Sequence, residues 1–266
     1  MLSVQQTAQY YTDGYIVVPG LLDKDETDIL AEISRLDARL AGMMNVRLDA
    51  TGGKTTLALD NNLGDDIYSA IVRSNRIFEA TTQILSDEPY HYHHKVSAKQ
   101  PYEGGAWEWH QDYGYWYNNG CLFPNMVSCY IAIDPATREN GCLQVLRGSH
   151  LIGRLDHGKT GGQTGADMER VNAALEQLEL VYVELAAGDA VYFHCNTLHR
   201  SDQNRSPNPR WGLICCYNAR HNSPYKDGPH PRYTPLEPLP DAEVVEVGRR
   251  QLASLEAQAA ESAMTV

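Results

Sequence analysis

Residues 126–146, MVSCYIAIDPATRENGCLQVL, decide the fold class of this chain, because they hold two short apolar runs separated by a turn-rich segment. Short apolar runs bounded by turn residues are typical of β-strands. Runs of the same kind lie on either side, at 91–98, 181–185, 190–194 and 211–217. The pattern after Asp87 therefore predicts an antiparallel all-β core of sandwich or jelly-roll type.

The part before residue 88 is mainly helical in pattern. A helix over 3–13 is expected to stop at Gly14, and a strand follows at 15–18. Asp23 has the position of an N-cap for a helix over 24–42, in which leucine and isoleucine recur at helical spacing. Further helices are predicted at 65–72, 75–86, 166–178 and 240–262, whereas 43–64 is predicted to be irregular.

Nothing in the chain has the composition of a linker. We therefore expect a single domain over 1–266, with an all-β core and flanking helices. Its mainly helical part would span 1–88, its β core 89–220 and a C-terminal extension 221–266.

The composition and net charge limit the classes of partner that the chain is expected to bind. The 266 residues have 42% hydrophobic content and a formal net charge of −12, which argues against nucleic acid or an anionic membrane as partner. A pocket can still be locally basic, so an anionic small molecule remains possible as substrate. There is no apolar run of transmembrane length, no signal-peptide pattern and no CxxC pair among the six cysteines. We expect a cytoplasmic protein with buried, reduced cysteines, and its oligomeric state stays open.

The sharpest local feature is Trp109-His110-Gln111-Asp112. In a strand, residues i and i+2 point to one face, so His110 and Asp112 could offer a nitrogen and a carboxylate oxygen to one metal ion. Alone this pair is a weak signal. His199, which follows the apolar run 190–194, would complete a set of two histidines and one carboxylate that suits non-haem Fe(II). Arg210, eleven residues later, could hold a carboxylate with a bidentate pair of hydrogen bonds.

With these residues in view, the sequence resembles the phytanoyl-CoA dioxygenase family of Fe(II)/2-oxoglutarate oxygenases. The likeness covers roughly residues 8–220 and includes the N-terminal stretch GYIVVPGLL. It rests on motifs in a fixed order: Lys99-Gln100-Pro101, His110-Gln111-Asp112, Glu139-Asn140-Gly141-Cys142-Leu143, Gly148-Ser149-His150, His199-x-Ser201 and Arg210.

The resemblance implies a double-stranded β-helix core and an enzyme that uses Fe(II), 2-oxoglutarate and O₂ to hydroxylate a C–H bond, releasing succinate and CO₂. It assigns the iron to His110, Asp112 and His199. It places Arg210 at the distal carboxylate of 2-oxoglutarate, with Ser201, Tyr130 and Lys99 as further contacts of the co-substrate.

Other histidines compete for these roles. His194 is the rival third ligand, although its spacing to Arg210 departs from the family pattern. On a regular strand His91 and His93 would share one face and His94 the other, which favours packing or pocket-lining roles over ligation. His150 is expected to cap its turn or to face the site.

Residues 153–160, GRLDHGKT, match the P-loop pattern letter for letter. A P-loop needs a buried strand before it and a helix after it, whereas a turn precedes this segment and two glycines follow it. We expect instead a loop near the pocket mouth. A non-catalytic metal-binding jelly roll and a zinc hydrolase remain as alternatives, and a halogenase is disfavoured because Asp112 fills the position that chloride would need.

The substrate is less defined by the sequence. The aromatic run after the HxD motif could border the iron, either as packing or as a cage for an ammonium group. The stretch 106–120 resembles family members that hydroxylate 2-aminoethylphosphonate or its N-methylated forms, so a small zwitterion is expected. Ectoine-like or amino-acid-like substrates and acyl-CoA are the alternatives. The predicted substrate contacts are Tyr113, Tyr115, Trp116, Asn118 and Arg147, with Arg154 and Lys159 as further basic residues at the mouth.

Overall fold

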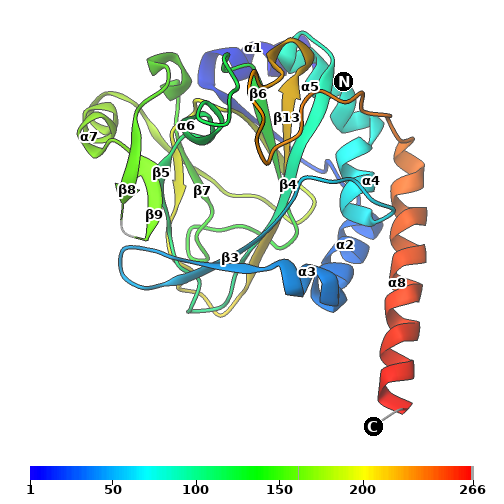
Figure 1. Ribbon diagram of the computed structural model, residues 1–266. Coiled ribbons are helices and arrows are strands. Elements are labelled where there is room, and N and C mark those ends of the chain that lie inside the picture. The colour runs from blue at the N-terminus through cyan, green and yellow to red at the C-terminus, as the bar shows by residue number, and fades with distance from the viewer. Residues whose placement is uncertain (161, 265–266) are drawn as a thin grey trace.

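The computed structural model describes residues 1–160 and 162–264 (Figure 1). In this part of the chain the strands form two main antiparallel sheets and one separate hairpin. The large sheet has the order β1 (Tyr15–Val18), β11 (Ala190–His194), β6 (Met126–Ala132), β13 (Arg210–Ala219), β4 (Pro89–Lys99), β3 (Lys54–Asp60) and β2 (Asn45–Leu48). The small sheet has the order β10 (Leu180–Val183), β7 (Leu143–Leu146), β12 (His199–Ser201) and β5 (Trp107–His110), and the hairpin joins β8 (His157–Thr160) to β9 (Gln163–Ala166).

The two sheets pack face to face. Apolar side chains from both of them form one cluster, in which Val191 and Phe193 of the large sheet meet Val145 and Val183 of the small one. Such a sandwich leaves the ends of its strands free to carry a site. The predicted all-β core is therefore confirmed.

Helices cover the outer face of the large sheet (Figure 1). They are α1 (Val4–Asp13), α2 (Lys24–Leu36), α3 (Ala38–Met43), α4 (Ile67–Arg73), α5 (Asn75–Leu85) and α8 (Asp241–Met264), whereas α7 (Met168–Gln177) lies at the other side. The short helix α6 (Asp112–Trp116) and the 3₁₀ turns η1 (Ser149–Ile152) and η2 (Arg220–Asn222) connect strands. We propose that the chain is one domain, because α8 packs on α2 and α4 of the N-terminal part.

Two predictions about the N-terminal part are wrong. The helix expected over 24–42 is broken at Asp37, whose backbone is extended and whose carboxylate accepts hydrogen bonds from the N–H groups of Arg39 and Leu40, starting α3. The segment 43–64 is not irregular: it contains β2 and β3, and β3 pairs with β4. All four residues of β2 are exposed, so the strand has no apolar alternation that a sequence pattern could reveal.

The short strands β8 and β9 were not predicted, whereas β5 and β12 were expected only as strand residues at His110 and His199. The six cysteines are buried, as expected. None of the helices in the described ranges has the length and apolar character needed to cross a bilayer.

Candidate active site

Three side chains with metal-binding atoms converge at one end of the small sheet. His110 ends β5 and His199 begins β12, and the two residues are direct partners in the antiparallel pair. Asp112 follows two residues later as the first residue of α6. The ligand atoms of the three residues lie within 4.8 Å of one another, close enough to hold a single ion. The expected convergence is present, but its reason differs: Asp112 lies on a helix start, where the chain turns after Gln111, and not on the strand.

Hydrogen bonds orient both imidazoles toward the common centre. Nδ1 of His110 donates to the Glu108 carbonyl at 2.7 Å, and Nδ1 of His199 donates to the Thr197 carbonyl at 2.9 Å. Each bond places the proton on Nδ1 and leaves the Nε2 lone pair for a metal, as in most protein metal sites. Burial lowers the pKa of both rings, that of His110 to about 3, so both stay neutral and able to ligate.

The carboxylate of Asp112 is held as firmly. Its Oδ2 accepts a hydrogen bond from Ser128 Oγ at 2.7 Å, and Lys95 Nζ lies 3.9 Å from its Oδ1. Burial opposes ionisation, but the charge of Lys95 and the hydrogen bond from Ser128 keep the pKa of Asp112 below its ordinary value. Two neutral imidazoles and one carboxylate fit Fe(II) with positions left open for other ligands.

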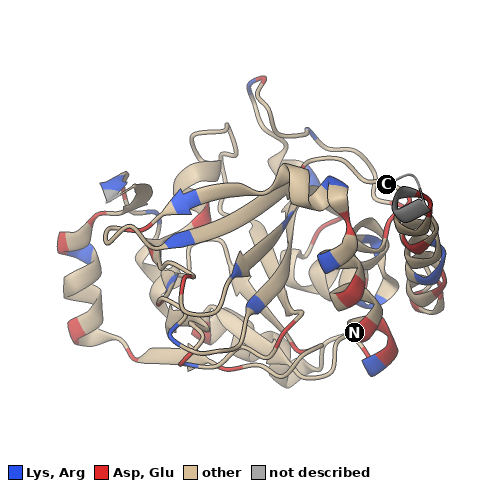
Figure 2. Ribbon diagram, turned by 90° about the horizontal axis from the view of Figure 1, so that it is seen from below, with Lys and Arg blue, Asp and Glu red and all other residues tan. Residues whose placement is uncertain are grey.

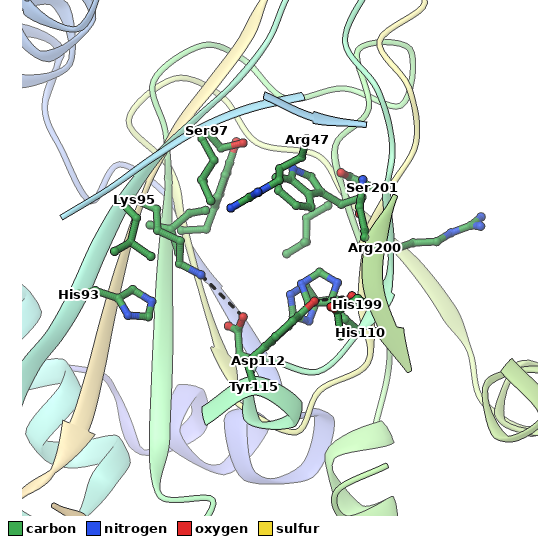
Figure 3. A pocket seen from close by; sticks show the side chains of 18 of the residues that line it. Arg47, His93, Lys95, Ser97, His110, Asp112, Tyr115, His199, Arg200 and Ser201 are labelled. Carbon is green, nitrogen blue, oxygen red and sulfur yellow. Dashed lines mark hydrogen bonds and ion pairs between the residues drawn. The ribbon is translucent and has the colours of Figure 1, made fainter. Parts of the chain in front are cut away.

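A cavity of about 630 Å³ opens above these three residues (Figure 3). One of its walls carries polar atoms that have no partner within the described part of the chain: Arg210 Nε, Ser201 Oγ and Tyr130 Oη. The Arg210 guanidinium lies 5.4 Å from the centre of the Tyr130 ring and donates one bond to the Gly141 carbonyl. Buried donors are normally paired, so three unpaired ones on one wall fit a carboxylate such as that of 2-oxoglutarate.

The rest of the cavity is basic in an otherwise acidic protein. Arg47 from β2, Lys95 from β4 and Lys159 from β8 line it, and Asp112 is the sole acidic residue among the described lining residues. Figure 3 shows the Arg47 side chain entering the cavity from above, whereas Arg200 points away from it. Arg200 stacks 5.0 Å from the Trp109 ring centre and bonds to Gln144, so its charge is used elsewhere.

Comparison with known proteins now decides the family. The profile of the phytanoyl-CoA dioxygenase family (PhyH) matches residues 10–212. The chain is 34% identical over 237 residues to the L-proline trans-4-hydroxylase of Streptomyces griseoviridis, covering 81% of this chain and 86% of that protein. It is 28% identical over 256 residues to the ectoine dioxygenase of Halomonas elongata, covering 89% of this chain and 77% of that protein.

The chain belongs to the phytanoyl-CoA dioxygenase family. It is an Fe(II)/2-oxoglutarate-dependent dioxygenase of the hydroxylase type, with Fe(II), 2-oxoglutarate and O₂ as its cofactors and co-substrates. The fold agrees. EctD from S. alaskensis, solved with 2-oxoglutarate and 5-hydroxyectoine, superposes with a TM-score of 0.75 at 21% identity over 90% of this chain and 88% of that one. The epimerase SnoN, solved with Fe³⁺ and α-ketoglutarate, superposes with a TM-score of 0.70 at 22% identity, over 89% of this chain and 93% of that one. The double-stranded β-helix predicted for this dioxygenase is thereby confirmed.

The predicted substrate contacts divide into two groups. Tyr115 and Trp116 line the cavity. Tyr113 faces an apolar cluster and donates its hydroxyl to the Cys121 carbonyl, because about half a turn of α6 separates it from Tyr115 and places it on the opposite side. Asn118 donates back to the Gly114 carbonyl, also away from the cavity. Neither Tyr113 nor Asn118 is among the described residues that line the cavity.

Three basic residues are also placed differently from the prediction. Arg147 pairs with Glu179 at 3.1 Å and lies near Asp13, outside the cavity. Arg154 stacks on Tyr117 and pairs with Asp156. Lys99 is fully buried behind the cavity wall, where its ammonium donates to the carbonyls of Ser201 and Asp202 and does not line the cavity. Lys159 is the member of the predicted basic group that does line it.

The competing histidines lie away from the metal site. His194 packs against His150, with ring centres 5.4 Å apart, and its Nδ1 accepts from the Asn196 N–H. His150 Nε2 donates to the Tyr11 carbonyl, so this ring ties α1 to η1 and does not face the cavity.

The three histidines of β4 do not alternate as a regular strand would. The register against β13 shifts between Cys216 and Tyr217, opposite His93 and His91. This bulge places an extra residue between the two histidines and reverses the alternation. His91 and His94 therefore share a face and bond to each other at 3.1 Å, whereas His93 lines the cavity.

The P-loop-like segment has a structural role near the metal site. His157 Nε2 accepts a hydrogen bond from the Gln111 N–H at 2.9 Å, and Gln111 bonds through its side chain to Gly153 and Leu155. A Cβ at Gly114 would lie 2.1 Å from the His157 ring, so only glycine fits there. Strand β8 takes the place of the helix that phosphate binding would require.

Several cavity residues escaped the sequence argument. Lys95 and Ser97 share a face of β4 with His93, and period-two spacing along that strand could have found them once His93 was placed. Asn119 lies two residues after Tyr117, the last aromatic residue of the run. Arg47 and His230 come from segments without a recognisable pattern, and only the folded chain brings them to the cavity.

Proposed function

We propose that Nε2 of His110, Nε2 of His199 and the carboxylate of Asp112 hold the iron, and that Arg210, Ser201 and Tyr130 hold the distal carboxylate of 2-oxoglutarate. The support is the set of unpaired donors on one wall of the cavity beside three converging ligands. Bound Fe(II) and 2-oxoglutarate would activate O₂, the oxidant: one oxygen atom goes into succinate as 2-oxoglutarate loses CO₂, and the other is inserted into a substrate C–H bond. The chain itself orients the ligands, anchors the co-substrate and excludes water.

The substrate in this proposal is a small zwitterion, with an aminoalkylphosphonate as the first candidate. The observation that carries it is the charge of the cavity: Arg47, Lys95 and Lys159 line it, and the one acid of the described lining, Asp112, is assigned to the iron. Figure 2 shows Lys and Arg on strands in the middle of the molecule and many Asp and Glu residues on the helices around them. The acidic exterior repels an anion. An anionic group of the substrate therefore binds in the cavity through its attraction to the basic side chains inside.

Lys95 is the residue best placed to hold the anionic group next to the iron. Its ammonium is within 3.9 Å of the Asp112 carboxylate, which a bound Fe(II) would partly neutralise. The rings of Tyr115 and Trp116 border the same space and can face the positive end of the substrate. A substrate hydroxylated beside its anionic group fits this order of contacts.

An amino acid or ectoine-like substrate is the second candidate. The relatives named L-proline trans-4-hydroxylase and ectoine dioxygenase favour it. Such a molecule also carries a carboxylate that Lys95 or Arg47 could hold. An acyl-CoA would need a longer apolar groove than a cavity of about 630 Å³ offers.

The test is substrate-dependent succinate formation with 2-aminoethylphosphonate, L-proline, ectoine and an acyl-CoA, in the wild type and in Lys95→Met. We expect turnover with a zwitterion and a rise of about tenfold or more in its KM in Lys95→Met, because a charge-assisted hydrogen bond is lost. The KM for 2-oxoglutarate should stay at its wild-type value in Lys95→Met. Arg200→Ala, which removes a cation that points away from the cavity, is the matched control and should leave the substrate KM unchanged. Turnover confined to acyl-CoA, or a substrate KM indifferent to Lys95→Met, contradicts the proposal.

A further inference from the structure

Two histidines form a wall of the cavity that the reaction described so far does not use. His93 on β4 and His230 in the segment after η2 have ring centres 5.3 Å apart, and both line the cavity. Both ring nitrogens of His93, and Nδ1 of His230, are buried without a hydrogen-bond partner in the described ranges. A buried polar atom left without a partner lowers the stability of the folded protein. Three such atoms at one place in a cavity wall indicate a ligand group that pairs with them.

The chain fixes this pair in position before any ligand arrives. The Pro229 carbonyl accepts a hydrogen bond from Asn61 Nδ2 at 2.9 Å, and the Tyr233 hydroxyl donates to Glu88 at 2.6 Å. These two bonds hold the segment on either side of His230, whose ring stacks on Tyr92 at 4.9 Å. His93 in turn meets the Trp116 ring at 5.7 Å. A subsite built in this way loses little entropy when it binds.

Each histidine of the wall offers one hydrogen-bond acceptor, one N–H donor and an aromatic ring when it is neutral. Burial lowers the pKa of His93 and of His230, and the charge of Lys95 lowers both further, so each ring is neutral and has one lone pair. Asn119 borders the same space and donates its Nδ2 to the Tyr92 hydroxyl, which leaves its carbonyl oxygen able to accept. No carboxylate among the described lining residues other than Asp112 could receive a cation.

We propose that His93 and His230 form the amine subsite of the enzyme, accepting hydrogen bonds from an ammonium group of the substrate. The inference rests on the proposed function, since it places the positive end of the same zwitterion. Lone pairs require N–H donors, so the pair selects primary and secondary amines over quaternary ammonium groups, for which rings alone would suffice.

Lys95 sets the orientation of the substrate in this site. Its ammonium faces Asp112 at 3.9 Å, and its charge also reaches His93 and His230. An isolated ammonium at the histidine pair would be repelled by Lys95, whereas a zwitterion places its own anion against Lys95 and removes that repulsion. The subsite therefore recognises an amine only as part of a molecule that also carries an anion.

Binding of matched ligand pairs tests the subsite without relying on turnover. Calorimetry would be carried out anaerobically on the enzyme loaded with Fe(II) and 2-oxoglutarate. The pairs are 2-aminoethylphosphonate with ethylphosphonate, and L-proline with cyclopentanecarboxylate; the trimethylammonium form of the first compound is the quaternary probe. We expect, in at least one pair, a preference of about tenfold or more for the amine, which corresponds to about 1.4 kcal/mol. The quaternary form should bind more weakly than the primary amine.

His93→Phe and His230→Phe keep an aromatic ring and remove the lone pairs. Each should reduce the amine preference to near one and leave the binding of the amine-free partner almost unchanged. His93→Gln, which restores an acceptor, should recover part of the preference, and the exposed His221→Phe is the matched control.

Three results would overturn the inference: no amine preference in either pair, a preference that survives in both Phe variants, or an equal loss for both members of a pair. The last would indicate packing alone. Failure of turnover with a preserved amine preference would instead contradict the hydroxylation of these compounds, so the two proposals fail separately.

Discussion

The two faces of β4 carry similar side chains in opposite states. On the cavity face, His93 and Ser97 have buried polar atoms with no partner in the described chain, and Lys95 meets the Asp112 carboxylate (Figure 3). On the other face, His91 and His94 bond to each other at 3.1 Å, and His94 stacks on Tyr68. The histidines on one face thus bond to each other within the chain, whereas the histidine on the other face has no hydrogen-bond partner in the described chain.

This difference separates structural from functional polar groups. A buried group whose partners lie in the chain contributes to folding, and its removal lowers stability. A buried group without partners lowers the stability of the free enzyme and is explained by what binds there. The contrast predicts that substitutions on the two faces change different measured quantities.

The largest effect is expected at the iron ligands. His199→Ala should abolish substrate-dependent succinate formation, because two ligands cannot hold the iron in the same way. His194→Ala, which removes a histidine five residues earlier that bonds only within the chain, should retain turnover. If His194→Ala lost turnover and His199→Ala kept it, the third iron ligand would be His194 and not His199.

The next effect concerns the wall of unpaired donors. Arg210→Ala should raise the concentration of 2-oxoglutarate needed for half-maximal turnover by about 10–100-fold, since one charge-assisted pair contributes roughly 1.5–3 kcal/mol. Arg200→Ala removes an arginine that is already bonded to Gln144 and should leave this concentration nearly unchanged. Equal effects of the two substitutions would mean that Arg210 is not the anchor.

A smaller effect is expected on the free energy of unfolding, when substitutions on the two faces of β4 are compared directly. His94→Phe should lower the free energy of unfolding by about 1–2 kcal/mol, because His91 is left buried without its partner. His93→Phe should leave this free energy unchanged or raise it, since it removes two unpaired nitrogens. Denaturant titration of both variants measures the difference, and a reversed order would refute the distinction between the faces.

The last effect is a pH dependence of stability. Burial first, and then a neighbouring histidine, lowers the pKa of His91 to about 3 and of His194 to about 4, from an ordinary value of 6.5. Both rings are neutral in the folded protein, so the unfolded chain takes up more protons below pH 6.5. Stability should be highest above pH 6.5 and fall as the pH drops toward 4 and 3.

Urea unfolding at pH 7 and pH 5 measures this loss. His194→Gln removes one titrating group and should make the difference between the two pH values smaller than in the wild type. An unchanged difference would show that His194 does not contribute.

Much of the site follows from order and spacing along the chain. His110, Asp112, His199 and Arg210 were predicted together, because the motifs occur in a fixed sequence that one fold explains. The main strands were predicted because buried runs between turns are visible locally. The exposed strand β2 was missed for the opposite reason, since none of its residues is buried.

The substrate side was harder to predict, because it depends on details that spacing does not carry. About half a turn of helix separates Tyr115, in the cavity, from Tyr113, outside it. One bulge in β4 determines which histidines face inward. His230 reaches the cavity from a segment without regular structure, so only the tertiary fold relates it to His93.

The central claim is that this cavity holds Fe(II) and 2-oxoglutarate together. The most direct test adds both anaerobically to the metal-free protein and records the weak visible charge-transfer absorption that 2-oxoglutarate chelated to Fe(II) produces. We predict that the band appears in the wild type, is absent in His199→Ala and needs more 2-oxoglutarate in Arg210→Ala. A protein that binds the metal but forms no band would contradict the claim and favour a zinc-binding or non-catalytic role.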